Sequence, residues 1–253
     1  MELVLQQALE MMDKNHGDLV LKRRKDITGL PENLVVPGDL DLSGSSIERL
    51  PNNLKIGGSL NLMASKIKEL PDNLVVPGDL DLGYTPIQKL PKNLTVHGSL
   101  DLRFTKITSL PDDLTVPGHL YLTGGVIERL PDNLKVGRSL SLSNTEKIKE
   151  LPDDLVVPGN LNLSVSHIER LPKNIKIGGS LDLSRAKAIK ELPDDLVVPG
   201  DLDLSYSGIE KLPKNLKVGG SLDLRFVDMK KTDLPEDLVV RMGLFLNGVT
   251  LKK

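Results

Sequence analysis

The chemistry that this sequence offers most plainly is that of a binding surface, because its few aromatic residues recur at a fixed spacing. The 253-residue chain has three tyrosines, three phenylalanines and no tryptophan. Tyr84 and Phe104 lie twenty residues apart, as do Tyr206 and Phe226. Aromatic residues and arginine dominate the energetic centres of protein interfaces. The residues predicted to bind a partner are these four and the neighbours that complete the two groups, Asp101, Arg103, Tyr121 and Arg225.

Two simpler interpretations of the aromatic residues stay open. The rings could cover a corner of the fold at which any residue is tolerated. The near-identical phrases LGYT and LSYS, and LRFT and LRFV, are also compatible with simple duplication of a segment. The scarcity of aromatic residues elsewhere in the chain favours a binding role.

Other kinds of chemistry have weaker support. Six aspartates share one outward repeat position, but other residues interrupt the column, and calcium needs several converging oxygen ligands. The four histidines occupy different repeat positions, and the chain has no cysteine to act as a nucleophile or thiolate ligand. We therefore expect no enzymatic activity, no metal and no cofactor. The aspartates are Asp41, Asp81, Asp101, Asp182, Asp203 and Asp223, and the interruptions are Asn61, Tyr121, Ser141 and Asn162.

A run of four cations from Lys22 to Lys25 offers an alternative site for a phosphate or an acidic partner. Such runs are more often solvated turns. The formal net charge of −2 supplies no general field that would attract nucleic acid or an anionic membrane. We expect another protein as the partner. The alternative is an accessory ligand- or nucleic-acid-binding module that uses this basic turn.

These residues are carried by a repeat of about twenty residues, exemplified by GSLDLRFTKITSLPDDLTVP from Gly98 to Pro117. Repeats begin at regular intervals from Gly17 to about Gly243, which is typical of a solenoid. Leu-Pro-Asp-Asp suits a type I turn with proline at its first central position. The glycine that opens each repeat suits a corner with positive φ or close backbone approach. The residues predicted to point inward are Leu100, Leu102, Ile107, Leu110, Leu114 and Val116.

The predicted fold is a β-rich solenoid of about 11–12 right-handed parallel coils, with short strands and little helix. A second period of forty residues appears in the charged pair that follows the buried isoleucine. The pair Glu48-Arg49 is followed one repeat later by Lys68-Glu69, so opposite charges face each other on adjacent coils. We interpret these charges as structural, because like charges in the same column would repel.

The solenoid is expected to occupy residues 17–242, between an N-terminal capping helix in residues 1–16 and a C-terminal edge strand or cap in residues 243–253. Leu5, Ala8, Leu9 and Met12 recur at helical spacing. A final strand is predicted at residues 244–246, and its bare edge invites pairing with another chain. We expect a monomer, with an edge-mediated dimer as the alternative.

The repeat resembles the short 20-residue leucine-rich repeats of bacterial type III secreted effectors and related bacterial and phage proteins. The shared pattern is Leu-Pro, then Leu-x-Leu nine residues after the proline, then an aliphatic residue five further on, from about Gly17 to Val240. Serine or threonine replaces the asparagine usual in such repeats. A second inward pair, such as Leu54 with Ile56, favours a flatter, straighter solenoid than a horseshoe.

The resemblance and the aromatic residues together predict a non-enzymatic scaffold that binds a protein through its strand face. It would act as a bacterial or phage adaptor or inhibitor, or as a host-directed effector. The N-terminus lacks the features of a cleaved signal peptide, and no apolar run approaches the length of a membrane span. We therefore expect a cytoplasmic protein, with delivery into a host cell as the alternative.

Overall fold

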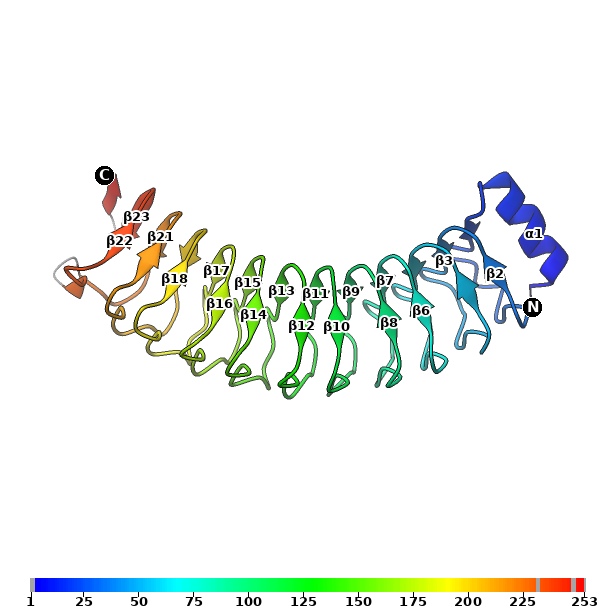
Figure 1. Ribbon diagram of the computed structural model, residues 1–253, viewed down its shortest axis with the longest axis horizontal. Coiled ribbons are helices and arrows are strands. Elements are labelled where there is room, and N and C mark those ends of the chain that lie inside the picture. The colour runs from blue at the N-terminus through cyan, green and yellow to red at the C-terminus, as the bar shows by residue number, and fades with distance from the viewer. Residues whose placement is uncertain (1–2, 231–232, 247–248, 253) are drawn as a thin grey trace.

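Figure 1 shows the computed structural model, which describes residues 3–230, 233–246 and 249–252. The coils stack along one axis, and the array bends into an open, shallow arc instead of a closed horseshoe. Helix α1 (Leu5–Lys14) lies at the N-terminal end. The predicted solenoid, with its short strands and little helix, is confirmed.

One long sheet runs the length of the array, and each coil contributes a strand to it. The leucine that begins a strand pairs in parallel register with its equivalent in the next coil, as Leu100 does with Leu120. In spatial order the strands are β1 (Leu19–Val20), β3 (Leu40–Asp41), β5 (Leu60–Asn61), β7 (Leu80–Asp81), β9 (Leu100–Asp101), β11 (Leu120–Tyr121), β13 (Leu140–Ser141), β15 (Leu161–Asn162), β17 (Leu181–Asp182), β19 (Leu202–Asp203), β21 (Leu222–Leu224), β23 (Gly243–Leu246) and β24 (Val249–Lys252).

A second short strand in each coil forms small parallel sheets of two or three strands. The first residue of such a strand faces solvent and the second faces the core, as Thr115 and Val116 do. This confirms the second inward pair of each repeat. The sheets are β2 (Val35–Val36) with β4 (Lys55–Ile56), β6 (Val75–Val76) with β8 (Thr95–Val96), β10 (Thr115–Val116) with β12 (Lys135–Val136), β14 (Val156–Val157) with β16 (Lys176–Ile177), and β18 (Val197–Val198) with β20 (Lys217–Val218) and β22 (Val239–Val240).

The core between the two sets of strands is an aliphatic ladder. In the repeat that starts at Gly98, all six residues predicted to point inward are buried. Serine and threonine fill the position at which asparagine was expected, and they are buried too. Thr85 Oγ1 donates to the Leu82 carbonyl at 2.6 Å, and Thr105 Oγ1 donates to the Leu102 carbonyl at 2.8 Å. These hydroxyls satisfy the carbonyl at the end of each strand within the same coil.

A polar ladder at the corner before the long sheet also joins the coils, and the sequence analysis did not foresee it. Asp39 Oδ1 accepts the Ser59 N–H at 2.6 Å, and Ser59 Oγ accepts the Asp79 N–H at 3.1 Å. Asp79 Oδ1 continues the chain by accepting the Ser99 N–H at 2.6 Å. The column continues with His119 and Asn160 among the aspartates and serines, so successive coils each supply an acceptor for a backbone N–H of the next.

The alternating charged columns form ion pairs between adjacent coils, as predicted. Lys68 Nζ lies 2.7 Å from Glu48 Oε2, and Arg49 Nε lies 3.2 Å from Glu69 Oε1. Glu128 departs from the pattern, since it pairs at 2.7 Å with Lys147 in a coil that has an extra residue. All these side chains are exposed, so solvent screens each pair and its contribution to stability is small.

The prediction for the turn needs correction, whereas the prediction for the glycines that open the repeats is confirmed. The hydrogen-bonded turn runs from Pro111 to Leu114, with a 3.2 Å bond from the Leu114 N–H to the Pro111 carbonyl, so the prediction of proline at the first central position was wrong. Leu110 stays out of the turn because its side chain is buried in the core. At the repeat starts, Gly17 has a positive φ. Gly98 lies so close to the preceding coil that a side chain would not fit. A Cβ on Gly98 would lie 2.2 Å from Asp79 Oδ1.

Both ends of the array are covered by local elements. Ala8 and Met12 of α1 are buried against the first coil, which is consistent with a cap, whereas Leu5 and Leu9 are each 49% exposed. At the other end, β24 folds back and pairs antiparallel with β23. The prediction of a bare edge at residues 244–246 was therefore wrong, because the outermost strand is β24. The domain boundaries at residues 16 and 242 stay predictions.

Candidate functional site

A corner follows each strand of the long sheet, and one residue of the corner has a positive φ of 55–65°. We call these residues the corner column. They are Arg23, Gly44, Ala64, Tyr84, Phe104, Gly124, Asn144, Val165, Arg185, Tyr206 and Phe226. The left-handed conformation costs most L-residues about 1–2 kcal/mol and is least costly for glycine and asparagine. Aromatic residues at this position therefore occupy it at a cost in backbone strain.

Strain at the corner column leads to a first prediction, for Val165→Asn. Val165 is β-branched, 45% exposed and has a φ of 57°, while Asn144 takes the same position one coil earlier. We expect the asparagine variant to gain about 1 kcal/mol in free energy of unfolding and to melt about 2–4 °C higher.

Differential scanning calorimetry measures this gain against a matched control, Val156→Asn. Val156 is similarly exposed at 47%, but it lies in β14, where valine is favoured over asparagine. The control should gain nothing or lose stability. Equal shifts for the two variants would show that side-chain polarity, not the corner conformation, sets the result.

The first aromatic cluster consists of Tyr84, Phe104, Tyr121, Arg103 and Asp101. The Tyr84 and Phe104 rings stack with their centroids 4.8 Å apart. The Phe104 ring also lies over Gly124, where an added Cβ would come within 2.3 Å of a ring carbon. The Arg103 guanidinium lies over the Tyr121 ring at 5.5 Å. The structure therefore brings together all five residues that the sequence placed in this group.

The second cluster repeats this arrangement with Tyr206, Phe226, Arg225 and Asp223. The Tyr206 and Phe226 rings stack at 4.1 Å, and the Arg225 guanidinium lies over the Phe245 ring at 5.6 Å. Phe245 occupies the position equivalent to that of Tyr121, because it pairs in register with Asp223 just as Tyr121 pairs with Asp101.

Phe245 and Arg185 also belong to the second cluster, and three of its members were not predicted to bind: Asp223, which was named only in the aspartate column, Phe245 and Arg185. Phe245 was missed because the lengthened coil after Met229 removes it from the twenty-residue spacing. The available signal was that Phe245 aligns with Tyr121 once the inserted residues are allowed for. Arg185 lies over the Tyr206 ring at 5.5 Å. Its residue type gave no signal, because Arg23 takes the same corner position outside both clusters.

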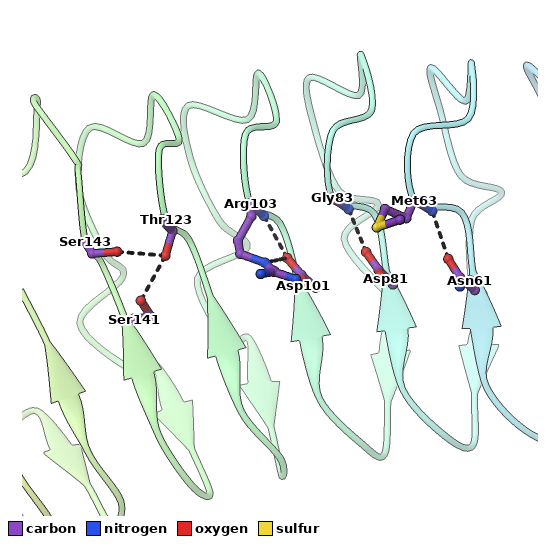
Figure 2. Close-up of polar contacts among 9 residues, drawn as sticks. All are labelled: Asn61, Met63, Asp81, Gly83, Asp101, Arg103, Thr123, Ser141 and Ser143. Atoms are coloured by element: carbon purple, nitrogen blue, oxygen red, sulfur yellow. Dashed lines mark hydrogen bonds and ion pairs between the residues drawn. The ribbon is translucent and has the colours of Figure 1, made fainter. Parts of the chain in front are cut away.

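Each arginine beneath a cluster is held by the aspartate two residues before it (Figure 2). Arg103 Nε donates to Asp101 Oδ2 at 2.7 Å, and the Arg103 N–H donates to Asp101 Oδ1 at 2.9 Å. The same contacts join Arg225 to Asp223. Asp101 is only 8% exposed, so the prediction that it points into solvent was wrong. Its carboxylate turns back because the corner supplies a backbone donor.

The other residues of the aspartate column form the same turn without an arginine. Asp81 Oδ1 accepts the Gly83 N–H at 2.9 Å, and Asn61 Oδ1 accepts the Met63 N–H at 3.0 Å (Figure 2). Burial raises the pKa of the Asp81 carboxyl, and the negative charges of Asp101 and Asp41 raise it further. The ionised form of Asp81 is therefore disfavoured in the folded protein.

The raised pKa leads to a second prediction, for Asp81→Asn. Because the folded pKa lies above the unfolded one, Asp81 favours the folded state below about pH 4, and this contribution is lost as the pH rises through the folded pKa. Asparagine keeps the acceptor, as Asn61 shows. We expect the variant to be more stable than the native chain at neutral pH, because it removes the charge that the folded state disfavours.

Urea denaturation of both proteins across the acidic range tests this expectation. The difference in stability should shrink toward zero below about pH 4, where the carboxyl is protonated in both states. A difference that is independent of pH would contradict the assignment to the Asp81 charge.

Small hydroxyl residues line the long sheet between the two clusters. Thr123 Oγ1 lies 2.9 Å from Ser141 Oγ and accepts from Ser143 Oγ at 3.0 Å (Figure 2). The corner column there holds Gly124, Asn144 and Val165. The aromatic clusters therefore flank a flat stretch of small polar side chains.

The basic turn at residues 22–25 is partly neutralised by the fold. Arg24 donates to both carboxylate oxygens of Asp26, at 2.8 and 2.7 Å, and these bonds lower the pKa of Asp26 to about 2. Lys25 Nζ donates to the Gly44 carbonyl. Two of the four cations are thus engaged within the chain, and the structure does not bring the turn into either aromatic cluster.

Other surfaces of the protein are weaker candidates for a functional site. A groove of about 890 Å³ follows the Leu-Pro corners of the first coils, past Pro51, Pro71 and Pro91. Similar grooves follow the same corners near Pro172 and Pro193, so the groove reflects the repeat rather than one special place. Within the described ranges, no three histidine, aspartate or glutamate side chains gather as they would around a metal ion.

Comparison with solved structures supports the fold. The effector YopM of Yersinia pestis, described as a leucine-rich effector protein, aligns over 88% of this chain and 69% of its own, with 20% identity and a TM-score of 0.52. YopM of Yersinia enterocolitica covers 96% of this chain and 73% of its own at 19% identity, with a TM-score of 0.40. A leucine-rich-repeat protein of Leptospira interrogans covers 79% and 68% at 18% identity, with a TM-score of 0.34.

The chain therefore has the fold of a leucine-rich-repeat solenoid. No protein-family model and no curated protein sequence matches it. The part of the chain that the structure describes has no helix with the length and apolar character needed to cross a bilayer.

Proposed function

We propose that this protein is a non-enzymatic scaffold that binds a partner protein through the two aromatic clusters of its long sheet. The observation that carries the proposal is the exposure of large rings at strained backbone positions. Tyr84, Phe104 and Phe226 are 55%, 43% and 60% exposed, and all three have a positive φ. Residues held in sparsely populated conformations concentrate at functional sites.

The spacing of the clusters supports a broad contact surface. Six steps along the corner column separate Tyr84 from Tyr206, as Phe104, Gly124, Asn144, Val165 and Arg185 lie between them. At about 4.8 Å per coil, the clusters lie roughly 29 Å apart. That distance suits an interface of ordinary size, with aromatic and arginine anchors at two places and a flat polar region between.

The clusters are also well ordered for binding. In each, one ring supports the next, and the arginine is held by an aspartate and an aromatic ring. Side chains that are already fixed lose little conformational entropy when a partner arrives. The proposal includes that this protein acts on its partner as a bacterial or phage adaptor or inhibitor, or as a host-directed effector. The basic turn supports a nucleic-acid role less well, because Arg24 and Lys25 have partners within the chain.

A quantitative pull-down tests the proposal, with lysates of the source cell and of candidate hosts. The native chain is compared with the double variant Arg103→Glu, Phe104→Ala, and circular dichroism checks the fold of each. We expect one protein to be enriched by the native chain and lost with the variant.

A matched double variant, Lys135→Glu with Val156→Ala, makes the same kind of change on the short sheets. Lys135 and Val156 are both exposed there. This control should retain the partner. Equal recovery of the partner by all three proteins would remove the long sheet from the binding surface.

A further inference from the structure

An arginine is missing from the first aromatic cluster at a place where the second cluster has one. In the second cluster, Arg185 precedes Tyr206 by one coil in the corner column and lies over its ring at 5.5 Å. The other side of the Tyr206 ring stacks on Phe226. The order along the column is therefore cation, tyrosine, phenylalanine.

In the first cluster the same column position before the tyrosine is Ala64. Tyr84 stacks on Phe104, but alanine has no side chain that can reach across its other face. The exposures agree with this difference, because Tyr84 is 55% exposed and Tyr206 is 38% exposed. One face of the Tyr84 ring thus lacks the cation that its counterpart has.

A second arginine is missing beside the same ring. Arg103 binds Asp101, and Arg225 binds Asp223, in each case from the position just before the phenylalanine. The equivalent position before Tyr84 is Gly83, so Asp81 has no arginine from its own coil. A Cβ at Gly83 would lie 3.2 Å from Asp81 Oδ1 and 3.5 Å from Asp101 Oδ1. Gly83 therefore leaves the half-buried Asp81 without a side-chain donor from its own coil, whereas the buried Asp101 already binds Arg103.

The local charge favours a cation there. Asp81 lies between Asn61 and Asp101 in the sheet, and Asp101 already holds Arg103. Asp81 has no ion pair of its own in the described part of the chain, and Arg103, which interacts with its charge, is already bound to Asp101. A guanidinium suits such a place because it stacks on an aromatic face and binds a carboxylate through its N–H groups.

We propose that the notch formed by Tyr84, Gly83 and Asp81 receives an arginine side chain of the partner protein. This inference rests on the proposed function and specifies the chemistry of the partner. The partner's guanidinium would lie against Tyr84 as Arg185 lies against Tyr206, and would pair with Asp81 as Arg103 pairs with Asp101. The second cluster already holds Arg185 against its tyrosine, so the two clusters differ in what the tyrosine ring can accept.

The repeat itself supplies variants that fill the notch from within. Ala64→Arg places an arginine before Tyr84, at a position where Arg185 has the same positive φ in its own coil. Gly83→Arg places one beside Asp81, as Arg103 stands beside Asp101. Ala64→Gln and Gly83→Gln are the uncharged controls of similar length.

The test uses a random-peptide display library selected on the full chain and counter-selected on Tyr84→Leu. Peptides that need Tyr84 are expected to be rich in arginine, and replacing that arginine by glutamine should weaken binding about tenfold. Ala64→Arg, Gly83→Arg and Asp81→Asn should each lower binding by a similar factor. The two glutamine controls should lower it less, and Lys135→Gln, an exposed position on the short sheets, should leave it unchanged.

The outcomes separate this inference from the proposed function. Two results would overturn the arginine notch and leave the scaffold role in place. One is the selection of peptides that need Tyr84 or Phe104 but contain no arginine. The other is peptide binding that stays unchanged in Asp81→Asn and Gly83→Arg. Selection of peptides that bind equally well when both clusters are removed would overturn the scaffold role and the notch together.

Discussion

Replacing Leu120 by alanine is expected to lower the free energy of unfolding by about 3–5 kcal/mol, the largest effect of any single change considered for this protein. Leu120 is fully buried in β11, and its strand pairs with both neighbours, β9 and β13. In a solenoid each coil contacts only its neighbours, so a cavity in a central coil weakens two interfaces at once. Surrounding coils are themselves packed and cannot collapse into the space.

Urea denaturation followed by far-ultraviolet circular dichroism measures this loss as a lower midpoint. The matched control is Val126→Ala in the same coil, where the side chain is 40% exposed. Its effect should stay within about 0.5 kcal/mol. A loss for Leu120→Ala that is no larger than the control would mean that the aliphatic ladder does not hold the coils together.

Phe104→Ala is expected to weaken binding of the partner protein by about thirty-fold or more, which corresponds to the 2 kcal/mol or greater of an interface hot spot. The ring is the centre of the first cluster, because it lies between the Tyr84 ring and the bare backbone of Gly124. Its loss would remove contact area and also leave Tyr84 without the surface that orients it. Alanine is not expected to unfold the corner, since Ala64 takes the same conformation.

Isothermal titration calorimetry with the purified partner gives the dissociation constants. The matched control is Val165→Ala, which truncates an exposed side chain of the corner column between the clusters. We expect it to change affinity by less than about threefold. If Val165→Ala costs as much affinity as Phe104→Ala, the binding energy is spread along the column and the clusters are not its anchors.

The repeat and its core could be predicted from the sequence because they depend on one-dimensional spacing. Leu100, Leu102 and Ile107 could be identified as inward-facing from the alternation in GSLDL and from the aliphatic residues that follow it. Stacking of equal repeats then requires that neighbouring strands pair in parallel register. The same spacing placed opposite charges on adjacent coils, as the Lys68–Glu48 pair shows. It also brought Tyr84 next to Phe104, since residues one period apart must be neighbours.

The tertiary structure alone decided how the corners are built and what their side chains contact. Residue type did not show that Tyr84 and Phe104 have a positive φ, because such corners usually favour glycine or asparagine. Whether Asp101 faces solvent or turns back to the Arg103 N–H depends on the direction of a backbone donor that spacing does not specify. The hairpin of β23 and β24 was likewise hidden, because it depends on a chain reversal outside the repeat.

Spacing along the chain thus determined which residues of this protein are neighbours, because a solenoid converts a sequence period into distance. Conformation at each corner determined which faces of those neighbours are free. Ala64 and Gly83 look unremarkable in the sequence, yet in the folded corner the Tyr84 ring is 55% exposed and Asp81 has no arginine from its own coil. The physical reason is that side-chain direction follows φ and ψ, which stacking and hydrogen bonding settle only in three dimensions.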